Sequence, residues 1–454
     1  MKYKKNKEIN LSIFRSYDIR GIYPSKLDEK VAYKIGRAFA IFAKAKKVAV
    51  GRDMRLSSPV LSEALIKGIT DQGVDVYDIG QVPVECVYFI VGGYDYGAGV
   101  AITASHNPKE YNGFKLVKRE GRTVRVVPGE EIKEMVEIGN FSDNKNKGEI
   151  RRIDIWQNFL NHIFSFIDAK KIKPFKIIID AGNGMAGKAI PMIEKKLSIK
   201  IIPLNFNLDG NFPAHPPNPL LKESTVQISR EIKSQNADFG VIFDGDADRI
   251  FLLDEKGEFI RADITLLLLA KYFLKKYPGK GVAYNLICSK AVPEFIKEWG
   301  GKPIRTKVGF VNVQRGILEN NGIMGGELSG HYSFKDNFYL DSGFISFLVL
   351  LEIISESERK VSELVKDFSP YAKAAEINFE VSDKEKILKK IRKKYSNGKQ
   401  DFLDGITVEY SDWWFNIRPS QTEPFLRLTI EAKTQPLLEE KKNELVGLIG
   451  KIER

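Results

Sequence analysis

The chain has few of the residues that bind transition metals or form disulfides. Its 454 residues include two cysteines, Cys86 and Cys288, and four histidines. The cysteines fit neither a zinc-ligand spacing nor a disulfide framework, so we expect two reduced thiols in the protein core. Four scattered histidines also argue against a histidine-rich metal site.

Long apolar segments are missing as well. The longest, ITLLLLAKYFL, is interrupted by Lys271 and is shorter than the ~20 residues that span a bilayer, so it predicts a core helix. No apolar stretch with a cleavage site follows the basic segment MKYKKNKEINLSIF. We therefore expect a cytoplasmic protein that does not bind membranes.

The net charge of +12 is not concentrated in any basic tail. Lysines and arginines alternate with acidic residues along helix-like segments and do not interleave with aromatics, which argues against a nucleic-acid partner. Two interpretations stay open and are compatible: a solvated, thermophile-like surface, or positive steering of an anionic small substrate.

Apolar strands alternate with helix-like segments, which is typical of α/β construction. A weak repeat is present, in which two strands of each unit lead into polar loops. The first strand and loop of each unit lie at 46–55, 175–184 and 280–289, and the second at 97–108, 237–249 and 321–331. Ligands bind beyond the carboxyl ends of such strands, so three loops that face one crevice would form a composite site.

The C-terminal part differs, with alternating strand patterns followed by a helix-like LLEEKKNELVGLIGKIE. We predict three similar mixed α/β domains and a smaller, different α+β domain that begins near Tyr371. The predicted domains are 1–150 with the serine loop, 151–254 with the acidic loop, 255–369 with a sugar-binding loop, and 370–454 with a phosphate-binding loop.

The strongest chemical signal is DGDADR, which follows the apolar strand residues VIF. Three carboxylates at i, i+2 and i+4 repel one another unless a cation neutralises them, and such oxygen donors suit Mg²⁺. The candidate ligands are Asp244, Asp246 and Asp248. A surface turn and an aspartyl-nucleophile phosphatase are the alternatives, but Arg249 and its preceding aspartate stand where that phosphatase pattern usually has Thr or Val.

A second loop with reactive side chains is TASHNP. In this loop Ser105 follows a strand, and Pro108 prevents the strand from continuing. It lacks a Gly-x-Ser-x-Gly elbow, so acyl chemistry is not expected. A serine beside Mg²⁺ and basic groups suits phosphoryl transfer. His106 and Lys115 are candidates to neutralise phosphate charge or move a proton.

Two further loops carry binding chemistry. In GGELSGH, Glu327, Ser329 and His331 occupy alternate positions, and on an extended segment they would point the same way and grip sugar hydroxyls. RPSQTEPFLR has the composition of a phosphate cradle, since Arg418 can fork onto two phosphate oxygens. The other donors predicted for the anion are Ser420, Gln421, Thr422, Tyr17 and Arg20.

Three other features are predicted to be structural. DAGNGMAG lacks the dinucleotide fingerprint and predicts a strand-to-helix turn. His215 stands among prolines, and Trp413 and Trp414 are expected in the core or at its rim.

Together these loops resemble one family, the α-D-phosphohexomutases of the phosphomannomutase/phosphoglucomutase superfamily. The similar motifs, in order along nearly the whole chain, are YDIRG, TASHNP, NGFK, DAGNGMAG, DGDADR, GELSGH and RPSQTEP. The resemblance implies four domains around a central cleft. It also implies a hexose 1-phosphate/6-phosphate mutase, a monomer or homodimer, whose partner is a sugar phosphate.

The resemblance further implies the roles of individual residues. Ser105 is carried as a phosphoserine, Mg²⁺ is held by the three aspartates and the serine phosphate, and a hexose 1,6-bisphosphate is the intermediate and activator. The implied catalytic residues are Ser105, His106, Lys115 and Arg249. The implied substrate-binding residues are Tyr17, Arg20, Gly309, Glu327, Ser329, His331, Arg418, Ser420, Gln421, Thr422 and Arg427.

This chain departs from the family pattern at three positions. Gln421 stands where Asn or Gly is usual, Phe310 where many members carry histidine, and Ile287 where some have a basic residue implicated in proton transfer. The general acid and base therefore stay open among His331, Lys115 and a metal-adjacent group.

The substrate stays open too. GELSGH is nearer the GEMSGH of glucose and mannose mutases than the GEQSGH of glucosamine mutases. A phosphoglucosamine mutase or phosphopentomutase is the alternative enzyme, and a sugar-phosphate binding module is the non-enzyme alternative.

Overall fold

Residue contacts group the chain into two compact units. The first unit is Met1–Ile260 with Ser329–Ser362, and the second is Arg261–Leu328 with Glu363–Arg454. The computed structural model describes residues 9–142, 144–420 and 425–453. Among these residues, none of the helices combines the length and the apolar character that crossing a lipid bilayer requires.

The first unit contains a seven-stranded sheet in the order β1-β5-β4-β2-β3-β7, with β6 paired to β5. Helix α1 begins at the N-cap Asp28, whose side chain accepts a hydrogen bond from the Val31 amide. Helices α1 and α2 pack together over this sheet, with Ile35, Leu65 and Ile69 fully buried. The elements are β1 (Ile19–Ile22), α1 (Glu29–Ala43), β2 (Lys47–Arg52), α2 (Ser58–Thr70), β3 (Asp75–Gln81), α3 (Val84–Gly93), β4 (Ala98–Ile102), β5 (Tyr111–Glu120), β6 (Thr123–Val127), α4 (Glu130–Ile138) and β7 (Ile150–Arg152).

A second sheet in the first unit has the order β11-β10-β8-β9. Strands β8, β9 and β10 are parallel, and β10 is buried along its whole length, as expected for a strand covered on both faces. The elements are α5 (Trp156–Phe164), β8 (Lys176–Asp180), α6 (Ala186–Glu194), β9 (Lys200–Leu204), α7 (Lys222–Gln235), β10 (Phe239–Phe243), β11 (Ile250–Leu253), β15 (Tyr332–Phe334) and α11 (Gly343–Ser357). The predicted strand-to-helix turn lies between β8 and α6.

The second unit begins with three parallel strands in the order β13-β12-β14. The apolar run around Lys271 forms helix α8, and most of its side chains are buried, so the predicted core helix is confirmed. The elements are α8 (Ala262–Lys276), β12 (Gly281–Asn285), α9 (Ala291–Glu298), β13 (Lys302–Thr306), α10 (Phe310–Glu319) and β14 (Gly322–Gly326).

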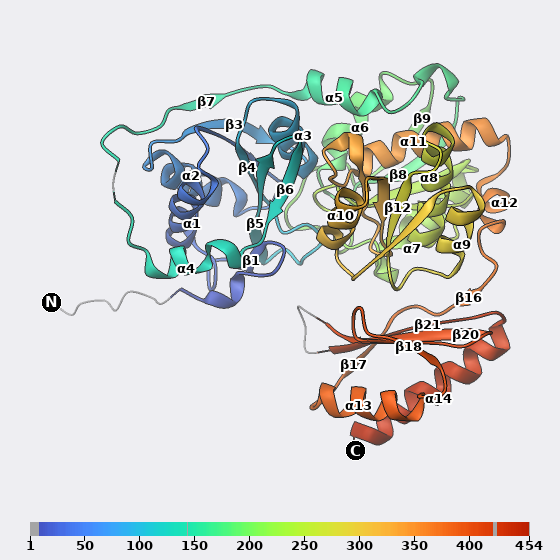
Figure 1. Cartoon of the computed structure of the whole chain (residues 1–454). Coiled ribbons are helices and arrows are strands. Elements are labelled where there is room, and N and C mark those ends of the chain that lie inside the picture. The colour runs from blue at the N-terminus through green and yellow to red at the C-terminus, as the bar shows by residue number, and fades with distance from the viewer. Residues whose placement is uncertain (1–8, 143, 421–424, 454) are drawn as a thin grey trace. The chain divides into compact units, whose positions relative to one another are not determined.

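The C-terminal part of the second unit is an antiparallel sheet in the order β16-β21-β20-β19-β18, with β17 paired to β21. Helices α13 and α14 lie together on one face of this sheet (Figure 1). Phe415, Leu428 and Leu445 are buried in its core. From residue 361 on, the elements are α12 (Val361–Lys366), β16 (Ala372–Lys373), β17 (Ile377–Glu380), α13 (Lys384–Lys394), β18 (Lys399–Asp401), β19 (Ile406–Glu409), β20 (Trp413–Pro419), β21 (Phe425–Ala432) and α14 (Gln435–Glu453).

The repeat of strand and polar loop is present in the fold. In each of the three repeats the two predicted strands are parallel neighbours, as β2 and β4, β8 and β10, and β12 and β14. The predicted α/β multi-domain architecture is therefore confirmed, while the four domain boundaries stay predictions. Cys86 and Cys288 are both buried and unpaired, as predicted.

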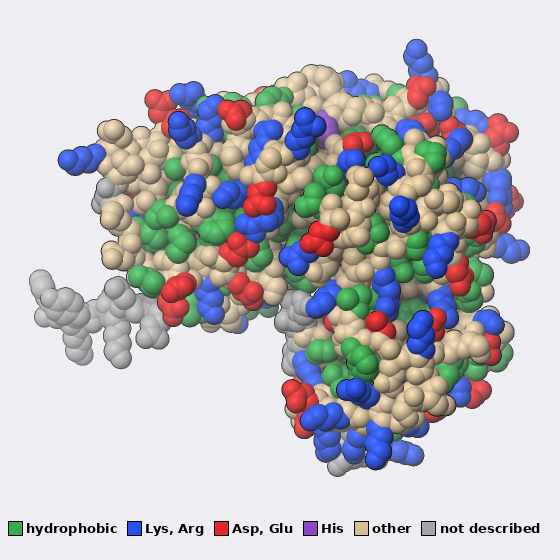
Figure 2. Space-filling model, in the orientation of Figure 1, with side chains coloured by type: hydrophobic (Ala, Val, Ile, Leu, Met, Phe, Trp, Pro, Cys, Tyr) green, Lys and Arg blue, Asp and Glu red, His purple; other side chains and the backbone are tan. Residues whose placement is uncertain are grey.

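Charged side chains of both signs are intermixed on one face of the protein (Figure 2). Figure 2 shows Lys and Arg side chains scattered among Asp and Glu on the visible face. This dispersion agrees with the distribution of the positive charge along the sequence.

Candidate functional site

The loop after strand β4 carries Ser105 and turns it away from the sheet. The Ser105 backbone is left-handed, with a φ of 48°, which is uncommon outside glycine. The Ser105 amide donates to Thr103 Oγ1 at 2.9 Å. The buried Ser105 hydroxyl then donates to Asp244 Oδ2 at 2.7 Å, and its oxygen lies 3.2 Å from His106 Nδ1. The loop therefore places the serine oxygen against the acidic loop.

Three aspartates, Asp244, Asp246 and Asp248, gather in the loop between β10 and β11. Their ligand atoms lie within 4.8 Å of one another, and all three side chains are buried. A φ of 68° at Ala247 folds the loop tightly. The structure thus brings together the three carboxylates predicted from the sequence.

Burial and mutual repulsion perturb two of these carboxyl groups. Burial and the charge of Asp248 raise the pKa of Asp246 to about 7, against the opposing charge of Lys115. Burial disfavours the charged form of Asp248 too, but the charges of Lys115 and His331 hold its pKa well below the usual range. The cluster therefore concentrates negative charge that a cation stabilises.

Two basic side chains from different elements contact the carboxylates. The Lys115 ammonium, on β5, lies 2.9 Å from Asp246 Oδ2 and also binds Asp248 Oδ2. The Arg249 Nε donates to Asp244 Oδ2 at 2.8 Å. Although burial lowers the pKa of Lys115, the two carboxylates keep it well above its usual value, so the lysine stays charged.

The donor set fits a divalent metal ion. Among the residues that the structure describes, Asp246 Oδ1 and Asp248 Oδ1 are buried oxygens that accept no hydrogen bond. Unsatisfied buried carboxylate oxygens are costly, and hard oxygen donors at this spacing suit Mg²⁺. Asp244, Asp246, Asp248 and Ser105 would hold the ion.

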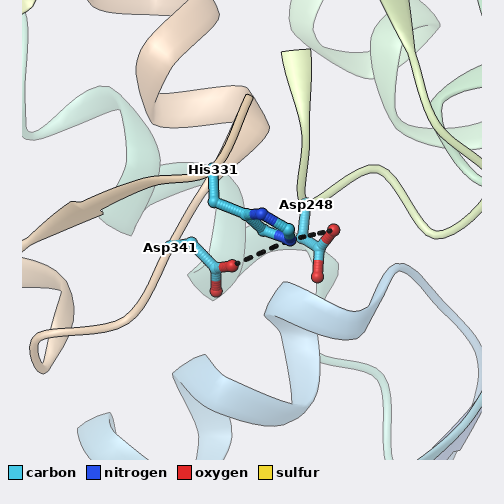
Figure 3. Close-up of side chains that lie close together, drawn as sticks. All are labelled: Asp248, His331 and Asp341. Carbon is cyan, nitrogen blue, oxygen red and sulfur yellow. Dashed lines mark ion pairs between the residues drawn. The ribbon is translucent and has the colours of Figure 1, made fainter. Parts of the chain in front are cut away.

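A histidine and a fourth aspartate adjoin the cluster (Figure 3). The His331 Nε2 lies 3.6 Å from both Asp248 Oδ1 and Asp341 Oδ2, and its Nδ1 lies 2.9 Å from Ser329 Oγ. Burial and the charge of Asp248 raise the pKa of Asp341 to about 7. Asp341 is absent from the predicted site, because an acid followed by a serine N-cap, here Ser342 of α11, has the sequence signature of an ordinary helix start.

Other predicted residues lie near the serine loop. The Arg20 guanidinium, on β1, binds Asn107 and Asp18, so it contacts the serine loop itself. Tyr17 is half-buried just before β1. Burial and the neighbouring charge of Arg249 hold the pKa of His106 well below its usual range, so His106 is neutral at pH 7.

The expected extended conformation of GGELSGH is wrong. Residues 328–330 form a turn, and Gly330 has a φ of 87°, a left-handed conformation that favours glycine. Ser329 and His331 therefore belong to the first unit, whereas Glu327 belongs to the second.

In the second unit, backbone and side-chain donors orient the Glu327 carboxylate. Its Oε1 accepts from the Gly309 amide at 2.9 Å and from Asn285 Nδ2 at 3.2 Å. Gly309 has a φ of 118°, which favours glycine at this position. The Cys288 thiol donates to Asn285 Oδ1 at 3.1 Å, which fixes the orientation of the amide. Asn285 is absent from the predicted site because an Asn at a strand end has no distinctive signal.

Two predicted arginines meet at one carboxylate. Arg418 on β20 pairs with Arg427 on β21 in the strand register. The Glu376 carboxylate binds the Arg418 guanidinium and accepts from Arg427 Nη1 at 3.1 Å. The Ser420 amide donates to the Phe425 carbonyl at 2.8 Å. The predicted Gln421 and Thr422 lie outside the described residues.

His215 and the tryptophans have structural surroundings. His215 Nε2 lies 3.1 Å from Asp180 Oδ2, and His215 Nδ1 lies 2.8 Å from the Pro216 carbonyl. Burial lowers the pKa of His215, but the hydrogen bond and charge of Asp180 outweigh it, so the pKa is raised above its usual value. Trp413 and Trp414 are buried in β20, as predicted.

Four family models match the chain in order. Three are the alpha/beta/alpha domains I, II and III of phosphoglucomutase/phosphomannomutase, at residues 11–142, 156–257 and 261–371. The fourth is the phosphoglucomutase/phosphomannomutase C-terminal domain, at residues 376–448.

Relatives match over nearly their full length. The phosphomannomutase of Vibrio cholerae is 37% identical over 98% of this chain and 99% of its own. That of Methanocaldococcus jannaschii is also 37% identical, over 98% of this chain and 99% of its own. Among solved structures, a phosphoglucomutase/phosphomannomutase family protein from Burkholderia thailandensis matches with a TM-score of 0.89 and 31% identity, over 98% of each chain.

Proposed function

The chain belongs to the phosphoglucomutase/phosphomannomutase family and is a phosphohexomutase, and we propose that Ser105 carries the phosphoryl group in its reaction. The observation that carries this proposal is the 2.7 Å hydrogen bond from Ser105 Oγ to Asp244. It joins a buried serine to Asp244, a member of the cluster of three carboxylates that also contacts the cations of Lys115 and Arg249. Phosphoryl transfer depends mainly on such positioning and charge neutralisation.

We propose that the phosphorylated Ser105 donates to the free 1- or 6-hydroxyl of a hexose phosphate. The bond between phosphorus and Ser105 Oγ breaks as a bond forms between phosphorus and the sugar oxygen. The product is a hexose 1,6-bisphosphate, and transfer of its other phosphoryl group back to Ser105 completes the isomerisation. Mg²⁺ bound to the aspartates would neutralise charge on the moving phosphoryl group.

His331 is the base that we propose for the sugar hydroxyl proton. The other candidate positions, Phe310 and Ile287, have side chains that take no proton. His331 adjoins the metal-binding carboxylates, and Asp341, 3.6 Å from Nε2, stabilises the ring once it is protonated. The charged Lys115 has no free lone pair with which to accept a proton.

The second unit supplies the proposed grip on the substrate. The carboxylate of Glu327 binds sugar hydroxyls, and the paired guanidiniums of Arg418 and Arg427 bind the distal phosphate. Ser420, Gln421 and Thr422 are proposed to add donors for the same phosphate. Mannose and glucose phosphates are the proposed substrates, because the full-length relatives are phosphomannomutases. A cytoplasmic location is proposed because two unpaired thiols persist in a reducing compartment.

Three measurements test this function. The native protein is expected to be about 80 Da heavier than its sequence, the mass of one phosphoryl group, and Ser105→Ala is expected to abolish both the added mass and turnover. A chelator is expected to stop turnover until Mg²⁺ is restored. Full activity of the alanine variant would refute the role of Ser105.

Substrate kinetics decide between the candidate sugars. We expect the highest kcat/KM with mannose 1-phosphate or glucose 1-phosphate in a series that includes glucosamine 1-phosphate and ribose 1-phosphate. A higher value for glucosamine or ribose would overturn the proposed substrate, and binding without isomerisation would indicate a sugar-phosphate binding module.

A further inference from the structure

A single buried arginine binds the backbone of the serine loop at four points. The Arg55 side chain, which follows strand β2, is fully buried. Its Nη2 donates to the carbonyls of Ser105 and Asn107 at 2.8 and 2.6 Å. Its Nη1 donates to the carbonyls of Pro108 and Tyr111 at 2.8 and 2.9 Å. One guanidinium therefore binds both ends of the loop that presents the phosphoryl carrier.

These four bonds supply donors to carbonyls of the segment that leaves the sheet after β4 and rejoins it at β5, where the Pro108 carbonyl also accepts from the Tyr111 amide at 3.0 Å. Buried carbonyls need donors, and Pro108 has no amide with which to continue a ladder. Ser105 also has a left-handed backbone, which persists only where the surroundings over-determine it. The planar fork of Arg55 supplies this constraint, because it presents donors at fixed angles.

Other residues hold Arg55 itself in place. The Asp53 Oδ2 lies 3.3 Å from Arg55 Nε, and Asp53 Oδ1 accepts from the Arg55 amide at 2.9 Å. The centre of the guanidinium lies 4.9 Å from the centroid of the Phe212 ring. A Cβ added to Gly210 would lie 2.7 Å from Arg55 Cα, so the chain around Phe212 packs closely on the arginine. This packing joins the serine loop to the segment at 210–212.

We propose that Arg55 is a positioning residue for phosphoryl transfer, which holds the Ser105 loop so that Oγ meets the carboxylates and the incoming sugar in line. This role rests on the proposed function of Ser105. Arg55 reaches only backbone carbonyls on this loop, so it acts through the position of Ser105 and not on the substrate. A lysine side chain has a single nitrogen with three hydrogens to donate. It therefore cannot replace four hydrogen bonds that leave the guanidinium from two different nitrogens.

The test compares Arg55→Lys with Arg37→Lys. Arg37 is another buried arginine of the same unit, which donates to Tyr33 Oη and the Ser142 carbonyl. Because misplacement by about 1 Å costs about 100-fold in rate, we expect Arg55→Lys to lower kcat about 100-fold. KM for the sugar phosphate should change less than about threefold, since substrate contacts are intact. Arg37→Lys should keep kcat within about twofold.

Single-turnover kinetics measure the rate of phosphoryl transfer from Ser105 directly. This rate would not change if Arg55 only stabilised the fold. Sugar phosphate is mixed with phosphorylated enzyme, and loss of phosphate from Ser105 is followed. Arg55→Lys should slow this transfer as much as it slows kcat, in a protein whose thermal melt shows that it is still folded at the assay temperature. A kcat within threefold of the wild type, or a rise in KM alone, would overturn the proposal.

Phe212→Leu keeps the proposal testable if Arg55→Lys does not fold. Removing the aromatic face should loosen the guanidinium and lower kcat about fivefold, with KM unchanged; an unchanged kcat would refute the role of Arg55. A wild-type protein without phosphate on Ser105 and without turnover would instead refute the proposed function, and the role of Arg55 with it.

Discussion

The serine site of the first unit and the arginine pair of the second unit use charge in opposite ways. At the serine site, four buried aspartates meet Lys115, Arg249 and His331. In the second unit, the buried Arg418 and the partly exposed Arg427 both bind the carboxylate of Glu376, which is partly exposed too. Buried charges hold one geometry because separating them is costly, whereas a carboxylate that water reaches, such as Glu376, is held less strongly by its partners. The first arrangement suits chemistry at fixed atoms, and the second suits reversible binding of a phosphate.

Asp244→Asn gives the largest expected effect. Asp244 accepts from both Ser105 Oγ and Arg249 Nε, and an amide replaces one acceptor with a donor. We expect kcat to fall about 1,000-fold, while KM changes less than about threefold. Steady-state kinetics with the preferred sugar phosphate measure both.

The control for this variant is Asp254→Asn. Asp254 is a buried aspartate of the same unit that accepts from the backbone amides of Lys256 and Glu258. Its kcat should stay within about twofold of the wild type. If Asp244→Asn kept a tenth of the activity, the serine site would not be the centre of the chemistry.

Arg418→Lys is expected to act on binding. Lysine lacks the fork that binds two phosphate oxygens, so KM should rise about tenfold while kcat stays within about threefold. The control is Arg392→Lys on α13, an exposed arginine that lies over Phe402. A fall in kcat without a change in KM would show that the two regions do not divide their work as described.

Asn285→Ala is expected to have a smaller effect in the second unit. It removes the hydrogen bond from Asn285 Nδ2 to Glu327 Oε1 and leaves that from the Gly309 amide. KM should rise about threefold to fivefold, because one lost hydrogen bond to a charged group is partly compensated. Asn320→Ala, which removes only a bond to the Gly316 carbonyl, is the control. Equal KM values for the two variants would contradict the orienting role of Asn285.

His215→Gln gives the smallest expected effect, on stability and not on turnover. Burial lowers the pKa of His215, but the hydrogen bond and charge of Asp180 outweigh it, so the pKa is raised above 6.5. The pair therefore stabilises the fold fully below pH 6.5, and its contribution is lost as the pH rises through the higher pKa of the folded state.

Thermal melts between pH 6 and 9 measure this contribution. The melting temperature of the wild type should fall by about 2 °C more than that of His215→Gln over this range. Parallel curves for the two proteins would show that His215 is not charged in the folded state.

Local patterns in the chain were sufficient to predict the buried strands and the polar loops that follow them. Apolar runs such as that of β10 predict buried strands, and the spacing of Asp244, Asp246 and Asp248 brings their carboxylates together within one tight loop. Buried strands and tight acidic loops depend on residues that are neighbours in sequence, so they can be predicted without knowledge of the tertiary structure. The turn at 328–330 was not predicted from the local sequence. The alternating polar pattern there does not indicate that its glycine adopts a positive φ.

Contacts between distant segments were set by strand register and packing. Lys115 reaches the aspartates because β5 pairs with β4 and places Lys115 opposite Ala101. Arg55 reaches the serine loop across 50 residues, and Asp341 reaches His331 through the turn after β15. Composition and periodicity carry no information about which remote groups meet, since those meetings depend on how sheets and helices pack. The local sequence therefore determines which functional groups each loop carries. The tertiary structure determines which distant residues neutralise the charge of those groups and fix their orientation.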